Sequence, residues 1–257
     1  MLDIRDLQVK LGRHQVLDGI SLTARPGSVT AIVGPNGSGK TTLMRAMTGE
    51  LAYGGRLSLN GHEIRHCRAR DLAALRGVMA QSTQLGFPFT VLEVVRLGLV
   101  NGGGDPEALS ALAQVGLAGY EARMMAQLSG GEQARVHLAR VLVQVRQPVH
   151  AGQPRWLFLD EPVAALDIGQ QLAVMRLARR HADEGGGVVA VMHDLNLSSM
   201  FADTIALVLE GRLEACGTPA EVLNDRHLSR AYGCPLRVNA APSCGTWLLP
   251  QAVRDGG

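Results

Sequence analysis

The stretch that decides the fold reads Gly34-Pro35-Asn36-Gly37-Ser38-Gly39-Lys40-Thr41. The apolar run 28–33 precedes it, and residues 40–48 follow with helical spacing of their apolar side chains. A G-x-x-x-x-G-K-T pattern between a strand and a helix is the phosphate-binding P-loop, whose backbone N–H groups form an anion-binding nest at a positive helix end. An ordinary glycine-rich surface turn is the alternative interpretation. The context of strand, loop and helix favours the phosphate site.

The chemistry of this loop assigns roles to its last residues. Lys40 is predicted to reach the β- and γ-phosphates of a nucleotide, and the Thr41 hydroxyl to bind Mg²⁺. Thr42 completes the predicted nucleotide-binding stretch. Of the 25 basic residues, 23 are arginine and only Lys10 and Lys40 are lysine. Retaining one lysine inside a glycine-rich turn indicates that a compact ammonium is needed there.

A second chemical signal is the apolar run 156–159, which ends in Asp160 and Glu161. A buried strand that ends in adjacent carboxylates suggests a function, because an unpaired buried carboxylate is costly. Asp160 is predicted to hold Mg²⁺, and Glu161 to polarise an attacking water. Alone the pattern is weak, since any strand can run into an acidic turn. Beside a P-loop it favours nucleoside triphosphate hydrolysis.

The rest of the chain alternates strands and helices around these motifs. Strands are predicted at 2–9, 16–24, 56–59, 77–80, 155–160, 187–192 and 204–209, and helices at 168–183 and 195–201. Helical periodicity dominates residues 90–145. We therefore predict an α/β P-loop NTPase core (1–81 and 151–216) with an N-terminal antiparallel β region, an inserted helical subdomain (82–150) and a small α+β tail (217–257).

Composition excludes several classes of protein. With 257 residues, 46% of them hydrophobic, the chain can bury a full core, which excludes a disordered or fibrous protein. No apolar run approaches the ~18 residues of a membrane span, and no signal peptide is apparent, so we expect a cytosolic protein. A net charge of +2 with 4% aromatic residues argues against nucleic acid as a partner. The four cysteines form no C-x-x-C pair, so we expect free thiols.

A third segment reads Leu128-Ser129-Gly130-Gly131-Glu132-Gln133. A serine hydroxyl and two glycine amides at a helix start suit a second phosphate site. The alternative is a capping box in which Ser129 is the N-cap and Glu132 is its partner, and both interpretations can hold at once.

With this segment the sequence resembles the ATP-binding subunits of ABC transporters, whose signature reads LSGGQ or LSGGEQ. The resemblance covers about residues 1–225. It includes Gln81 as the Q-loop glutamine, 165–167 as the D-loop, and His193 as the switch histidine.

The resemblance implies a head-to-tail homodimer that hydrolyses ATP with Mg²⁺. Each ATP would lie between the P-loop of one subunit and the signature residues of the other, which here are Ser129, Gly130, Gly131 and Glu132. Gln81 would contact Mg²⁺ or the attacking water, and His193 the γ-phosphate. Without the resemblance, His193 would more often be a buried core histidine. The family pattern is not met at Ala164, where the D-loop normally has serine, or at Leu11, where the family usually has an aromatic residue that stacks on adenine.

A finer resemblance is to the ATPases of hemin importers, because Phe87-Pro88-Phe89 follows the Q-loop and an extension spans 147–154. It implies a separate permease dimer, an indirect periplasmic hemin-binding partner, and a peripheral location on the cytoplasmic face of the inner membrane. Phe87 and Phe89 would help shape the groove for the permease, or would simply pack in the core. Alternatives are an ATPase of siderophore or vitamin B12 import, a soluble ABC ATPase of DNA repair or translation, and a non-hydrolysing regulatory module. Glu161 argues against the last, and the single cassette without sustained heptads against the soluble class.

Overall fold

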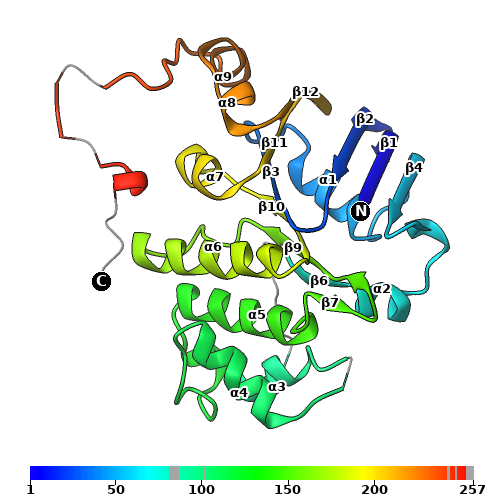
Figure 1. Ribbon diagram of the computed structural model, residues 1–257, viewed down its shortest axis with the longest axis vertical. Helices are drawn as coiled ribbons and strands as arrows, with labels where there is room; N and C mark the ends of the chain where they lie inside the picture. Colours follow the sequence, from blue (N-terminus) through cyan, green and yellow to red (C-terminus); the bar gives the residue numbers. More distant parts are fainter. Residues whose placement is uncertain (81–86, 101, 242–243, 247, 253–257) are drawn as a thin grey trace.

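Two β-sheets of different kinds organise the chain, which is described by a computed structural model except at residues 81–86, 101, 242–243, 247 and 253–257 (Figure 1). The larger sheet has the strand order β12-β11-β3-β10-β9-β6. Strands β11, β3, β10, β9 and β6 pair in parallel, and β12 is an antiparallel edge. The bounds are β3 Val29–Val33, β6 Arg76–Met79, β9 Trp156–Asp160, β10 Gly187–Val191, β11 Thr204–Leu209 and β12 Arg212–Gly217.

The smaller sheet is antiparallel, with the order β2-β1-β4-β5. Its strands are β1 Leu2–Leu11, β2 His14–Ala24, β4 Gly54–Leu59 and β5 His62–Glu63. Alternation of buried and exposed residues along β2 leaves one face of the sheet for the core. The predicted fold class, an α/β P-loop core with an N-terminal antiparallel region, is confirmed.

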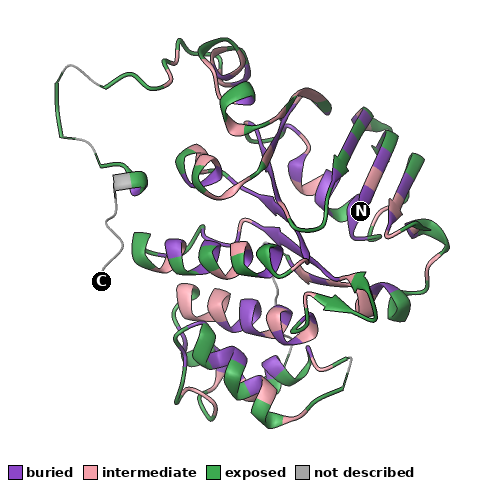
Figure 2. Cartoon of the chain, viewed as in Figure 1, coloured by how far each residue is buried: buried purple, intermediate pink, exposed green. Residues whose placement is uncertain are grey.

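Both faces of the larger sheet are buried, each in its own core (Figure 2). Successive side chains of a strand point to opposite faces. Val188 and Ala190 of β10 therefore pack with the helical insert, α6 (Ile168–Asp183) and α7 (Leu195–Phe201), whereas Val189 and Val191 pack with α1 (Lys40–Met47) and the antiparallel sheet.

The helical insert consists of α3 (Val91–Arg96), α4 (Asp105–Gln114), the 3₁₀ turn η2 (Met125–Gln127) and α5 (Gly130–Gln144). Apolar side chains from α3, α4 and α5 join the same core as one face of the large sheet. The predicted extension 147–154 is a short hairpin, with β7 (Val149–His150) paired to β8 (Gln153–Pro154).

Three features differ from the sequence prediction. The segment between β5 and β6 contains η1 (Ile64–His66) and α2 (Ala69–Leu75), which the sequence analysis did not predict. Strand β12 was also missed. The prediction of an α+β tail is wrong, because the described residues beyond Gly217 form α8 (Pro219–Val222), α9 (Asp225–Tyr232) and η3 (Pro250–Ala252) and no strand. Short polar elements such as these carry little periodicity for a sequence to reveal.

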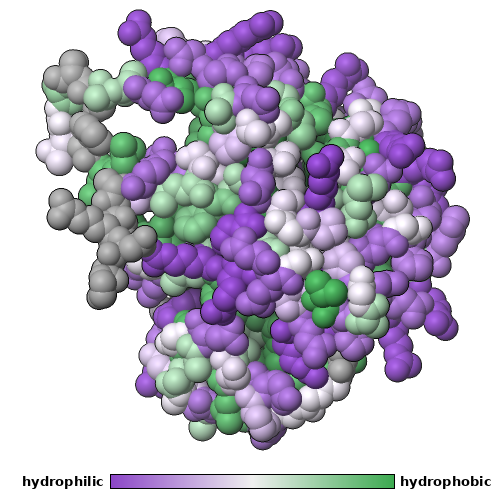
Figure 3. Space-filling view, viewed as in Figure 1, coloured by the Kyte–Doolittle hydropathy of each residue, from purple (hydrophilic) through white to green (hydrophobic). Residues whose placement is uncertain are grey.

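The tail returns to the body at its end. Gln251 in η3 lies against α7, where its side-chain amide donates to the Asn196 carbonyl at 3.4 Å. No helix in the described part of the chain is long and apolar enough to cross a bilayer. The face of the molecule drawn in Figure 3 is mostly hydrophilic, with small apolar patches between charged side chains.

Candidate functional site

The P-loop lies where β3 ends and α1 begins, at the carboxyl edge of the large sheet. Gly39 occupies the N-cap of α1 in the left-handed region (φ 106°), and an added Cβ would lie 2.7 Å from Leu17 Cδ2. At Gly34 an added Cβ would overlap the Val208 carbonyl. Only glycine fits both positions, because the loop passes closely beneath β2 and β11. The ordinary surface turn is thereby disfavoured.

Lys40 is buried beneath this loop, 5% exposed. Its ammonium donates to the carbonyl oxygens of Gly34 and Pro35, both at 2.9 Å. Burial lowers the pKa of the ammonium, and the nearby carboxylates of Glu161 and Asp160 oppose that shift. The loop thus holds one compact cation at its centre, where an anion bound by the backbone would meet it.

Asp160 ends β9 beside the loop and is 4% exposed. Its Oδ1 has no hydrogen-bond partner among the described residues, and neither has the buried Ser38 hydroxyl. Burial, followed by the charge of Glu161, raises the pKa of the Asp160 carboxyl to about 6. A buried carboxylate oxygen that lacks a protein partner fits a Mg²⁺ ligand, because hard cations prefer oxygen.

Glu161 and His193 meet at this edge, although they are 32 positions apart in sequence. His193 Nε2 lies 2.6 Å from Glu161 Oε1, and since a carboxylate only accepts, the imidazole donates. The backbone explains the meeting. Asp160 pairs with Val191 in the parallel register, and the Glu161 amide donates to the Val191 carbonyl at 3.1 Å. Glu161 itself has a left-handed backbone (φ 53°), which turns the chain sharply out of β9.

The predicted second phosphate site lies on the helical insert, where Ser129 caps α5. The Glu132 amide donates to Ser129 Oγ at 3.3 Å, and Glu132 Oε2 accepts from the Ser129 amide at 2.8 Å. The capping-box interpretation is therefore confirmed, and the phosphate role stays a prediction. Figure 1 shows α1 and the start of α5 well apart, so one chain does not bring the two predicted phosphate sites together.

These observations agree with the comparisons to known proteins. Residues 17–164 match the family described as "ABC transporter". The chain belongs to this family.

Relatives and solved structures of this ABC family resemble the whole chain. It is 56% identical to "Hemin import ATP-binding protein HmuV" of Jannaschia sp. (strain CCS1), over 100% of this chain and 97% of that protein. A protein of the same name from Roseobacter denitrificans is 56% identical over 98% of each chain. Among solved structures, the ATP-binding cassette MJ0796, in a dimeric post-hydrolysis state with ADP and Pi, is 25% identical with a TM-score of 0.74 and covers 85% of this chain and 99% of that one. The chain is therefore an ABC ATPase that binds nucleotide.

The predictions for Gln81 and for the pair Phe87 and Phe89 have different outcomes. Gln81, the predicted Q-loop residue, lies outside the described residues. Phe87 is 75% exposed, whereas Phe89 is partly buried against the core of the insert. The centroids of these two phenyl rings lie 6.4 Å apart in an edge-to-face arrangement. Core packing therefore accounts for Phe89 and not for Phe87.

Two glutamines that sequence reasoning did not single out hold the loops before α5 and α6. The Gln133 amide donates to the carbonyls of Met125 and Leu128, both at 3.1 Å. The Gln171 amide donates to those of Val163 (3.3 Å) and Leu166 (3.0 Å). Each glutamine thus fixes the loop that leads into its own helix, the signature loop in one case and the D-loop in the other. Glutamine near a helix start gives no sequence signal of such a role.

Proposed function

We propose that this ABC ATPase powers the import of hemin through a separate permease. The observation that best supports this proposal is the 56% sequence identity, over the full length of the chain, to a protein named for hemin import. The iron-siderophore and vitamin B12 alternatives lack comparable support, and so does a soluble ABC ATPase of DNA repair or translation.

Within one subunit, separate groups of residues would bind the phosphates of ATP and Mg²⁺. The backbone from Gly34 to Gly39, with Lys40 and Thr42, would hold the phosphates. Thr41 and Asp160, together with Gln81, would hold Mg²⁺, and the ion would supply positive charge that stabilises the phosphates during hydrolysis. Mg²⁺ suits Asp160 because its Oδ1 is buried without a partner among the described residues.

Hydrolysis would depend on Glu161 and His193. Glu161 would orient the attacking water and accept its proton, and His193, which donates to Glu161 Oε1, would position this carboxylate near the γ-phosphate. The geometry of the carboxyl edge and the family resemblance both support these roles.

The active form would be a head-to-tail homodimer. Ser129, Gly130 and Gly131, with Glu132 as the capping-box partner of Ser129, would close over the ATP held by the partner's P-loop. A relative solved as a dimer with ADP and Pi supports this arrangement. The two parts of the cassette would be the α/β core (1–81 and 151–216) and the helical subdomain (82–150), followed by the tail 217–257.

The assembly would lie at the cytoplasmic face of the inner membrane, with the ATPase dimer bound peripherally to a permease dimer. A periplasmic hemin-binding protein would take part indirectly, and no nucleic acid would be involved. The exposed Phe87 is the residue that we assign to the permease contact.

The test is transport in membrane vesicles that contain the permease, the hemin-binding protein and this subunit. We expect ATP-dependent accumulation of hemin, and none with Glu161→Gln. Vitamin B12 and a ferric siderophore, each supplied with its own binding protein, serve as competing cargoes. Accumulation of either one instead of hemin would contradict the proposal.

A further inference from the structure

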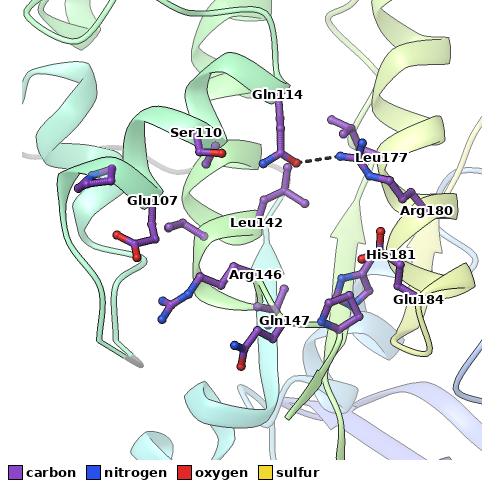
Figure 4. Close-up of a pocket in the computed structure, with 15 residues that line it drawn as sticks. Glu107, Ser110, Gln114, Leu142, Arg146, Gln147, Leu177, Arg180, His181 and Glu184 are labelled. Atoms are coloured by element: carbon purple, nitrogen blue, oxygen red, sulfur yellow. Dashed lines mark hydrogen bonds between the residues drawn. The ribbon is translucent and has the colours of Figure 1, made fainter.

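A groove between the helical insert and the α/β body takes no part in the proposed ATP chemistry (Figure 4). Its volume is about 470 Å³, within the range of small-molecule pockets. Its walls are α4, the end of α5 with the turn that follows, and the last turns of α6. None of the residues assigned to ATP or Mg²⁺ lines it.

The lining combines an apolar floor with two guanidinium groups. Leu142 and Leu177 contribute apolar surface from α5 and α6. Arg180 Nη2 donates to Gln114 Oε1 across the groove at 2.8 Å, and Arg146 Nη1 donates to the Gly102 carbonyl at 2.5 Å. In the described part of the chain no carboxylate lies within 4.0 Å of either guanidinium, so each keeps N–H donors for a ligand.

The surrounding charges favour an anion. The carboxylate of Glu107 is already engaged, because it accepts from the Gly104 amide at 2.8 Å and caps α4. Arg155 lies buried nearby, where burial and then the charge of Arg146 lower the pKa of its guanidinium. Glu184 remains exposed at the rim. Among the lining residues two arginines therefore face two carboxylates, and one of these, Glu107, is bound by the Gly104 amide.

We propose that this groove binds an amphipathic dicarboxylate, with its apolar body against Leu142 and Leu177 and its carboxylates on Arg146 and Arg180. Arginine is suited to this role because its planar fork binds carboxylates through two parallel hydrogen bonds. The molecule of this class that the subunit would meet is hemin, a flat apolar porphyrin with two propionates. The choice of hemin rests on the proposed function.

The two helices that enclose the groove also carry predicted parts of the nucleotide site. At their first turns, Gly131 of α5 packs against the D-loop, since an added Cβ would lie 2.9 Å from the Ala165 carbonyl. Near their last turns, α5 and α6 both line the groove. A ligand that fixes the two ends in the groove therefore biases the arrangement of the signature and the D-loop, and by reciprocity ATP changes the affinity for that ligand.

Binding is tested with metal-free protoporphyrin IX, a fluorescent dicarboxylate without iron, titrated against the full chain. We expect saturable binding that weakens about tenfold or more when Arg146→Gln and Arg180→Gln are combined, because charge-assisted bonds are lost. Ser110→Trp, on the exposed wall of α4, fills the groove and should weaken binding similarly. Arg70→Gln, on α2, is the matched control and should bind like the wild type.

Further titrations identify the ligand and test whether its binding is coupled to the binding of ATP. The dimethyl ester of protoporphyrin should bind at least about tenfold more weakly than the diacid. Hemin should displace protoporphyrin, and ATP added to Glu161→Gln should change the porphyrin affinity about fivefold or more. Equal binding by wild type, double variant and Ser110→Trp would overturn the site. Failure of hemin to displace protoporphyrin would overturn the assignment of hemin as the ligand. An unchanged porphyrin affinity on addition of ATP would overturn the coupling to the nucleotide site. Hemin uptake in vesicles reports separately on the proposed function, because it depends on the permease.

Discussion

Lys40 is assigned to phosphate binding and Glu161 to the hydrolytic step, so variants of the two residues should separate ATP binding from ATP hydrolysis. Lys40→Ala removes the only cation that the P-loop carbonyls hold, among the described residues, at the phosphate position. We expect ATP binding to fall below detection. Glu161→Gln keeps the shape of the side chain and a bond to His193 but cannot accept a proton, so ATP binding should persist while turnover falls at least about a hundredfold.

Steady-state ATPase rates, together with titration of a fluorescent ATP analogue, measure the two effects. Lys10→Ala is the control, because Lys10 is the other lysine and is exposed on β1. Turnover by Glu161→Gln at the wild-type rate would remove Glu161 from its assigned role.

Leu11 allows a test of base recognition. The residue is 44% exposed at the end of β1, so it does not fill the core between the first two strands. If it lies under the adenine, a leucine offers apolar contact without a π face, and the chain should discriminate poorly between ATP and GTP. Leu11→Tyr should tighten ATP binding by up to about tenfold, equivalent to ~1.4 kcal/mol.

Titration of both nucleotides, with a melting curve for each protein, checks this prediction. The exposure of Leu11 predicts an unchanged melting temperature. An unchanged ATP affinity in Leu11→Tyr would place the base elsewhere, for example beside Arg13 or His14.

Sequence reasoning identified the separate motifs of the site but not their contacts. The P-loop, Asp160 and Glu161 follow from local patterns of residue type. The 2.6 Å contact between Glu161 and His193 depends on the pairing of Asp160 with Val191, a register between strands separated by α6. Such a register is a tertiary property, and no short-range spacing encodes it.

At the scale of elements, the buried elements were the predictable ones. The predictions for 168–183, 195–201 and 204–209 match α6, α7 and β11 residue for residue. Helix α6 buries one face and so carries helical periodicity, whereas β11 is a short continuous apolar run, as expected of a strand buried in a parallel sheet. Strand β12 and helix α2 were missed because β12 is a half-exposed edge and α2 buries one residue, Leu72.

Helix α5 contains a buried histidine that should make stability depend on pH. His137 is 9% exposed, and burial, followed by the charge of Arg140, lowers its pKa to about 4. At His137 the unfolded chain therefore binds more protons than the folded chain between pH 6.5 and pH 4. This histidine should lower the stability of the folded state by up to about 3 kcal/mol as the pH falls through that window, whereas Asp160, whose folded pKa is raised to about 6, contributes in the opposite direction.

Chemical denaturation at several pH values measures this loss. His137→Leu removes the contribution of the histidine, whose Nδ1 has no partner among the described residues to lose. The stability of the variant relative to the wild type should therefore rise as the pH falls through the window. His66→Leu, on an exposed turn, is the control and should leave the dependence unchanged. Wild-type and His137→Leu curves that run parallel from pH 6.5 to pH 4 would contradict the prediction.

At the scale of the whole molecule, one chain carries two predicted phosphate-binding helix starts that lie far apart. Within a single chain, the signature at the start of α5 has no nucleotide to contact, because the P-loop lies across the molecule at α1 (Figure 1). In the proposed dimer a two-fold axis resolves the difficulty, since an isologous pair would bring each signature to the partner's P-loop. ATP would then lie in the interface, and dimerisation would depend on its concentration.

The dimer itself gives the last prediction. Glu161→Gln with ATP and Mg²⁺ should elute as a dimer in sizing chromatography, because bound ATP that is not hydrolysed keeps two interfaces closed. Without nucleotide the same protein should be mainly monomeric. Adding Ser129→Arg places a bulky cation where Ser129 caps α5 and should prevent the dimer while each monomer still binds ATP. The Ser129→Arg change also removes a helix cap, which is worth about 1 kcal/mol. Thr90→Arg removes the equivalent cap of α3 and is therefore the matched control. Glu161→Gln with Thr90→Arg should still dimerise. Equal dimer content in Glu161→Gln with and without Ser129→Arg would exclude the shared site.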